Sequence, residues 1–190
     1  MNLNLYNQAR DIWMNIFPLK ELKIPSVEHA FEKKNFWPLP TENSYHYVFN
    51  IRQMEIEYIS PNAAQILGFP LEEMNAPFLI SLIHPDDMPW FMAFEKKVVE
   101  FFNPLPYDVG QKYRTHYDVR LQKADGSYIR VLHQMQLMDA DKAGTSTRVL
   151  CVHTDISSLK KDGHPTLSFV GSDGAPSYFE VEVGWPTEAD

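Results

Sequence analysis

Three consecutive β-prone segments constrain the fold of this chain more than any other feature of its sequence. Residues 114–126 alternate between apolar and polar side chains and end in an Asp-Gly pair, which is typical of a tight turn. Residues 127–138 alternate in the same way. Residues 147–156 contain an unbroken apolar run from Val149 to Val152, which indicates a strand that is covered on both faces. We therefore expect three antiparallel strands in sequence, with the last one in the centre of a sheet.

A helical period precedes these strands. The apolar residues of this segment follow helical spacing from Pro85 onward: Met88, Phe91, Phe94, Val98 and Phe101. We expect Glu95, together with Lys96, Lys97 and Glu100, on the opposite, polar side of this helix. The pattern ends at the NPLP sequence, residues 103–106. This is the longest helix that the sequence predicts.

The HPDD sequence at residues 84–87 has two interpretations. Pro85 suits the first turn of a helix, and Asp86 and Asp87 place negative charge near the positive end of the helix dipole. A histidine beside two carboxylates could also be a metal site or an acid-base pair, but neighbouring residues rarely converge on one ion. We favour the start of a helix, because the signals for it are complete.

The flanking regions predict further elements. A helix is expected over residues 3–17, where Leu5, Ala9, Ile12, Trp13 and Ile16 form an apolar stripe, and a second one starts at Ser26. Residues 45–51 and 55–60 are β-prone and are joined by a tight turn, and short helical pieces follow, with Gly68 as a C-cap. A final hairpin is expected from residues 167–170 and 177–183.

The order of these elements gives an α+β fold, in which the helices lie on one face of a single antiparallel sheet. We divide the chain into an N-terminal helical extension (1–40), a central domain (41–160), and a C-terminal hairpin with a linker (161–190). Both faces of the central strand need cover. The helix at 3–17 could supply the second cover, from the same chain or from a second subunit, so we expect a homodimer through this helix and the sheet.

Composition excludes several classes of function. The formal charge of −8 and the absence of a long basic run argue against nucleic-acid contact by this segment. No stretch of 18 apolar residues and no signal-peptide pattern occur, so no membrane contact is expected and the chain should be cytoplasmic. Cys151 is the single cysteine, which rules out an internal disulfide and a cysteine metal cluster.

Four sequence motifs, in this order, resemble a PAS domain, a member of a family of small sensory modules. They are YISPNAAQILGF (58–69), LIHPDD (82–87), YRTHYDVRLQKADGSYIRV (113–131) and VLCVHTDIS (149–157). The resemblance covers about residues 45–160. It implies a five-stranded sheet in the spatial order 2-1-5-4-3, with the 147–156 strand in the centre.

In this family, ligands bind between the sheet and the long helix. The resemblance then implies a cavity with these walls: Phe91, Phe94, Val98, Val119, Val131 and His133. The alternative is a filled core, because an aromatic stripe at helical spacing more often packs than lines a pocket. By strand parity His116 points away from His133, while His153 could lie near one of them; a buried histidine with one hydrogen bond is commoner than a metal ligand.

The cofactor is unknown. Flavin-binding light sensors of this family carry a reactive cysteine on a mid-domain helix, where this chain has FLISLIHPDD (78–87), so no photoadduct is expected. Haem-binding members use a histidine from the long helix, and Pro85 to Phe102 contains none, so haem is not expected either. No metal-ligand spacing and no catalytic motif is present, and we expect a binding module that is not an enzyme.

Asp155 and Ser157 resemble the Asp-Ile-Thr that closes many PAS domains and joins the sheet to an output element, although both could simply cap the segment that follows. The whole layout is similar to the N-terminal part of bacterial LuxR-type transcription regulators, so a DNA-binding output domain is expected beyond Asp190. Two alternatives remain open. The chain could be the sensor of a histidine kinase, or a stand-alone module that binds a small ligand or a protein.

Overall fold

The computed structural model describes residues 3–15, 42–140 and 146–184. The helices and strands are α1 (Leu3–Met14), β1 (Ser44–Asn50), β2 (Glu55–Ile59), α3 (Asn62–Leu67), η1 (Leu71–Glu73), α4 (Ala76–Ser81), η2 (Pro85–Asp87), α5 (Met88–Phe102), α6 (Tyr107–Gly110), β3 (Tyr113–Gln122), β4 (Tyr128–Ala140), β5 (Ser146–Asp155) and β6 (Leu167–Gly171). The predicted helix that starts at Ser26 and the 185–190 end of the predicted linker lie outside the described residues.

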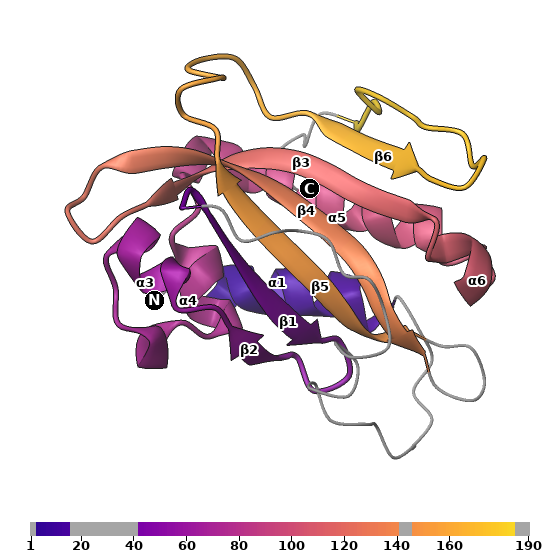
Figure 1. The fold of residues 1–190 in the computed structure, drawn as a ribbon, viewed down its shortest axis with the longest axis horizontal. Coiled ribbons are helices and arrows are strands. Elements are labelled where there is room, and N and C mark those ends of the chain that lie inside the picture. Colours follow the sequence, from indigo (N-terminus) through magenta and orange to yellow (C-terminus); the bar gives the residue numbers. More distant parts are fainter. Residues whose placement is uncertain (1–2, 16–41, 141–145, 185–190) are drawn as a thin grey trace.

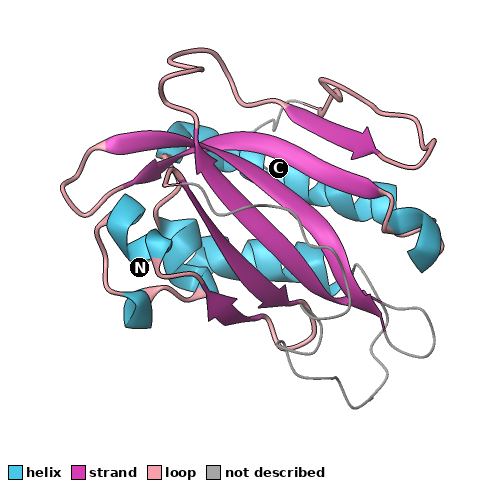
Figure 2. Cartoon of the chain, in the orientation of Figure 1, coloured by secondary structure: helices cyan, strands magenta, loops and turns pink. Residues whose placement is uncertain are grey.

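The strands form one antiparallel sheet in the order β2-β1-β5-β4-β3-β6 (Figure 1). The first five strands have the predicted order, and β5 is an interior strand between β1 and β4. The family resemblance therefore predicted this order correctly, and alternation predicted the strands themselves, because one side chain in two faces the helices. Figure 2 shows the helices gathered on one face of the sheet.

The C-terminal hairpin differs from the prediction. The first half, β6, pairs along its length with β3 and becomes a sixth strand of the main sheet. Its expected partner, residues 177–183, forms no regular strand, but Phe169 and Tyr178 form an isolated bridge and the Val181 N–H donates to the Leu167 carbonyl at 2.8 Å. The backbone of Glu180 has a φ of 48°, which lies outside the extended region and interrupts a regular strand. The hairpin is therefore formed only in part, on the edge of β6 that faces away from β3.

Helix α1 ends before the predicted limit and lies on an unexpected face. It packs against α4 and α5, on the same side of the sheet as those helices (Figure 1). Its Trp13 ring meets Phe49 edge to face, and the Tyr6 hydroxyl donates to the Met54 carbonyl. The expectation that α1 covers the second face of β5 is thus wrong for a single chain. The physical reason is that the helical face still offers apolar surface next to α4 and α5, which the Trp13 side of α1 buries.

The two faces of the sheet carry separate apolar clusters. The large cluster lies between the sheet and the helices and includes Phe91, Phe94 and Val131. A small second cluster consists of Val48, Met138, Leu150 and Val152, all buried. Residues 149–152 of β5 therefore alternate between the two clusters, which explains the unbroken apolar run in the sequence. Among the described helices, none combines the length and the apolar character needed to cross a membrane.

Candidate functional site

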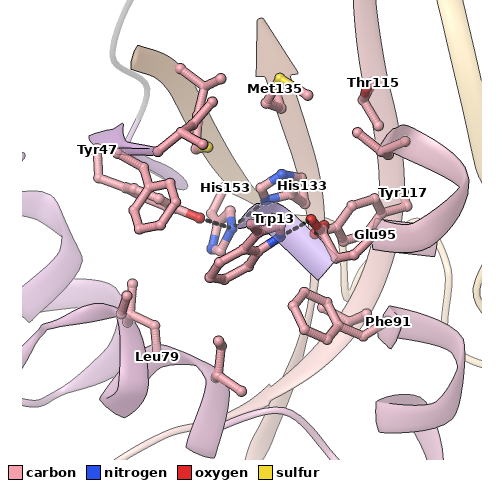
Figure 3. Close-up of a pocket in the computed structure, with 18 of the residues that line it drawn as sticks. Trp13, Tyr47, Leu79, Phe91, Glu95, Thr115, Tyr117, His133, Met135 and His153 are labelled. Carbon is pink, nitrogen blue, oxygen red and sulfur yellow. Dashed lines mark hydrogen bonds between the residues drawn. The ribbon is translucent and has the colours of Figure 1, made fainter. Parts of the chain in front are cut away.

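A cavity of about 110 Å³ lies between the sheet and the helices (Figure 3). Its volume is smaller than the roughly 150 Å³ of an apolar cavity that binds benzene, which has six non-hydrogen atoms, so it suits a molecule of about four or five non-hydrogen atoms. Most of its wall is apolar. The polar side chains in the wall are Trp13, Tyr47, Glu95, Thr115, Tyr117, His133 and His153, together with Cys151.

Four of the six predicted cavity residues line this space. They are Phe91 and Val98 from α5, Val119 from β3, and His133 from β4. The other two, Phe94 and Val131, are buried in the large apolar cluster beside the cavity and do not line it. Phe94 instead packs its ring against Tyr117. The core on this side of the sheet is therefore filled in part and open in part.

Glu95 is the most informative residue of the cavity, and its prediction was wrong. The charge pattern of residues 95–100 predicted it on the polar side of α5, but the structure buries it with 9% of its surface exposed. Its Oε1 accepts a hydrogen bond from the Tyr117 hydroxyl at 2.7 Å, and its Oε2 accepts one from Trp13 Nε1 at 2.5 Å (Figure 3). Glu95 follows Phe91 by four residues and precedes Val98 by three, so it lies on the apolar stripe. Helical spacing could have revealed this, since a charged residue at that position has to be buried.

In the part of the chain that the structure describes, no positively charged side chain pairs with Glu95. The other two buried acids among the described residues, Asp87 and Asp118, each pair with an arginine, whereas Glu95 receives only neutral donors. Burial raises the pKa of Glu95, and the hydrogen bonds from Tyr117 and Trp13 only partly oppose this. An unpaired carboxylate inside a folded chain is costly in free energy, so this site favours either a proton or a bound positive charge.

The substitution Glu95→Gln should therefore stabilise the ligand-free protein at neutral pH by about 1 kcal/mol, because it removes a buried charge and keeps the shape. The amide oxygen can accept from Trp13 Nε1, and the amide N–H can donate to the Tyr117 hydroxyl, which then becomes the acceptor. Since the pKa of Glu95 is raised in the folded state, the contribution of this acid to stability is fully present below its unfolded pKa of about 4.3 and is lost as the pH rises through the folded pKa. The gain in the variant should grow with pH over that range. Urea denaturation at a series of pH values measures it.

Glu100→Gln is the matched control for this experiment, because Glu100 is exposed on the same helix and pairs with Lys97 at the surface. This control should change the free energy of unfolding by less than about 0.5 kcal/mol. A Glu95→Gln variant that is less stable than the wild type at every pH would show that the carboxylate is favourable where it lies.

Two histidines form a buried hydrogen-bonded chain in the sheet. His133 Nδ1 and His153 Nε2 share a hydrogen bond of 2.8 Å, and His153 Nδ1 shares one of 2.6 Å with the Tyr45 hydroxyl. Burial lowers the pKa of His153 to about 3 and that of His133 well below its ordinary value, so both rings are neutral at physiological pH. His116 lies on the opposite face, where it shares a hydrogen bond with Gln134.

Two further groups complete the wall. The Thr115 hydroxyl is buried and has no hydrogen-bond partner in the part of the chain that the structure describes. Cys151 is buried on β5, and burial raises the pKa of its thiol, which therefore stays protonated. Within residues 3–15, 42–140 and 146–184, no group of three or more His, Cys, Asp or Glu side chains is arranged to hold a metal ion.

The HPDD sequence begins α5 through a short 3₁₀ turn, η2, with Pro85 as its first residue and His84 as its N-cap. This geometry agrees with the interpretation of HPDD as the start of a helix. Asp87 has a second role, besides placing negative charge near the positive end of the helix dipole. Its carboxylate is buried, pairs with the Arg120 guanidinium at 2.6 Å, and accepts the Arg120 backbone N–H at 2.7 Å. Asp87 therefore ties the start of α5 to β3. Burial alone would raise the pKa of Asp87, but the bonds from Arg120 outweigh it and lower the pKa.

The predicted junction residues Asp155 and Ser157 lie at the end of β5. The Asp155 carboxylate accepts hydrogen bonds from the backbone N–H and the hydroxyl of Ser157, and the Ser157 hydroxyl accepts the Arg130 backbone N–H from β4. Both residues therefore cap the strand end and attach it to β4, and neither lines the cavity.

Comparison with known families decides how this architecture is classified. The family model described as the PAS fold matches residues 56–153, which is just over half of the chain. The chain belongs to the PAS-fold family. Its expected character as a PAS sensory domain is thereby confirmed, whereas the match does not extend to the finer resemblance to LuxR-type regulators. Trp13 lies outside the matched residues, so α1 adds to this PAS domain a part of the cavity wall.

The chain is also similar to solved structures of signalling proteins. The N-terminal domain of a diguanylate cyclase with PAS/PAC sensor from Marinobacter aquaeolei is 23% identical, with a TM-score of 0.46, and the match covers 60% of this chain and 96% of that one. A domain of a putative light and redox sensing histidine kinase from Haloarcula marismortui is 17% identical, with a TM-score of 0.45 and coverage of 60% and 90%. Among curated proteins, no sequence matches this PAS domain significantly.

Proposed function

We propose that this PAS domain is a non-enzymatic sensory module that binds a small molecule in the cavity between the sheet and α5. The observation that carries the proposal is the cavity itself: a space of about 110 Å³ inside a packed interior, with polar side chains in an otherwise apolar wall. Interiors rarely keep such a void, and a few polar groups in an apolar wall are typical of ligand sites.

Two elements of the cavity wall, α1 and β5, could transmit the binding of a ligand to the rest of the protein. Helix α1 contributes Trp13 to the wall, so a ligand that contacts Trp13 or Glu95 changes how firmly α1 is held. The central strand β5 contributes Cys151 and His153 to the wall and ends at Asp155, where the junction begins. Signalling requires that the ligand bind one of two states of these elements more tightly than the other.

Native mass spectrometry of the purified protein tests ligand binding. The wild type should carry a reproducible extra mass that is lost on denaturation, and Ala76→Leu should not carry it, because Ala76 lines the cavity and a larger side chain fills the space. Ala124→Leu serves as the control, since Ala124 is exposed in the β3–β4 turn. If the wild type carries no extra mass, the purified protein holds no ligand in this cavity, and this would argue against the proposal.

We further propose that the output is a DNA-binding domain of a transcription regulator, as in the LuxR-type layout, and that the chain acts as a homodimer. Residues beyond Asp190, read from the source gene, distinguish the possibilities: a helix-turn-helix supports the regulator, whereas a phosphorylatable dimerisation helix supports a histidine kinase. Light scattering of the 22.1 kDa chain should give twice this mass, and a monomer at high concentration would contradict the dimer.

A further inference from the structure

The side chains of the cavity wall indicate which chemical class of ligand binds there. This inference rests on the proposed function, which is that the cavity binds a small molecule. The wall contains a buried carboxylate without a cation, Glu95, on one side of the space. Asp87 and Asp118 show that this chain otherwise pairs its buried acids with arginine among the described residues. Among the described residues, Glu95 is therefore the buried acid that no positively charged side chain pairs with.

Aromatic rings surround the same space. Trp13, Tyr47, Phe91 and Tyr117 line the cavity together with Glu95, and Figure 3 shows the Trp13 ring between Tyr47 on one side and Glu95 on the other. The faces of such rings carry negative charge density and attract organic cations, most strongly where water is excluded. A carboxylate among aromatic rings is the combination that proteins use for alkylated ammonium groups.

We propose that the cavity binds a small organic cation, an alkylammonium ion of about four or five non-hydrogen atoms, with Glu95 as its counter-ion and the aromatic rings as its walls. The two wall histidines do not oppose this charge, because burial keeps both of them neutral. The Thr115 hydroxyl, which lacks a partner, is available to a ligand that carries a hydrogen-bond acceptor as well. Binding would place a cation next to the Trp13–Glu95 hydrogen bond and so next to α1.

Tetramethylammonium chloride is the probe, and the full chain is titrated with it while the indole N–H signals are followed by NMR. The chain has four tryptophans, and the signal of Trp13 is identified by its loss in Trp13→Phe. We expect a saturable shift of the Trp13 signal that sodium chloride at equal ionic strength does not produce. In Glu95→Gln the affinity should fall about thirtyfold or more, which is the usual loss when one member of a buried charge pair is removed. Glu100→Gln, on the exposed side of the same helix, should bind as the wild type does.

A neutral probe separates this inference from the proposed function. tert-Butanol has nearly the size of tetramethylammonium and no charge. If tert-butanol shifts the Trp13 signal and tetramethylammonium does not, the cavity binds ligands, but the inference that its ligand is a cation is wrong. If Glu95→Gln binds the cation as tightly as the wild type, Glu95 is not its counter-ion and the inference is also overturned. If neither probe binds, both the inference and the ligand-binding function are wrong.

Discussion

Asp118→Ala should lower the free energy of unfolding by about 3–5 kcal/mol, the largest effect that we expect from a single substitution in this protein. Asp118 is buried between β3 and β4 and pairs with the Arg130 guanidinium and, at 2.9 Å, with Lys160 Nζ. It also accepts the Thr166 backbone N–H at 3.0 Å. Its removal leaves the buried Arg130 side chain without a counter-ion, and that uncompensated charge dominates the loss. Chemical denaturation measures the difference.

The same substitution should act locally on the segment after β5. Lys160 and Thr166 both bind the Asp118 carboxylate, so Asp118 is one of the side chains that attach this segment to the sheet, together with Arg130, which donates to the Gly163 carbonyl. Hydrogen exchange of the Thr166 amide should become faster in Asp118→Ala. Asp162→Ala is the control, because Asp162 is exposed in the same segment, and it should change stability by less than about 0.5 kcal/mol. Equal losses of stability in Asp118→Ala and Asp162→Ala would show that the buried ion pair of Asp118 contributes no more to stability than an exposed aspartate does.

Asp87→Ala should cost about 2–4 kcal/mol, and its neighbour supplies a matched control. Both Asp86 and Asp87 approach the Arg120 guanidinium, but the Asp86 side chain is 77% exposed at 3.8 Å, while the Asp87 side chain is 2% exposed at 2.6 Å. Asp86→Ala should therefore cost less than about 1 kcal/mol. The loss in Asp87→Ala stays below that of Asp118→Ala because Arg120 is partly exposed and can reach water.

The effect of Asp87 should depend on pH. Its pKa is lowered in the folded state, so its contribution to stability is present above the unfolded pKa and is lost as the pH falls through the folded pKa. The difference in free energy of unfolding between the wild type and Asp87→Ala should thus be constant near neutral pH and shrink in acid. A difference that does not change down to low pH would mean that packing, and not the ion pair, is what the substitution removes.

Much of the fold followed from the sequence because short-range periodicity reports which side of an element is buried. Alternation in residues 114–138 predicted β3 and β4, and the spacing of Met88, Phe91 and Val98 predicted α5. Gly68 was expected as a C-cap, and it closes α3 with a φ of 81°, a conformation that glycine adopts without strain. The order of the five PAS strands followed from the family resemblance, since local pattern alone does not choose the neighbours of a strand.

The candidate site was predicted only in part. Phe91, Val98, Val119 and His133 were expected in the wall and lie there, because strand parity and helical spacing decide which way a side chain points. Trp13, Glu95 and Tyr47 were missed as members of one site. Trp13 and Glu95 are separated by 82 residues, and only the packing of α1 beside α5 brings them together.

The sequence by itself determined the elements, the family and the faces of the strands, because these depend on interactions among residues close together along the chain. Tertiary structure alone decided that α1 lies over the cavity side of the sheet and that β6 joins the main sheet beside β3. It also decided which buried acids are paired, so that Asp87 and Asp118 meet arginines and Glu95 meets only neutral donors. These outcomes depend on competition between distant surfaces for burial and for charge, which local sequence patterns do not encode.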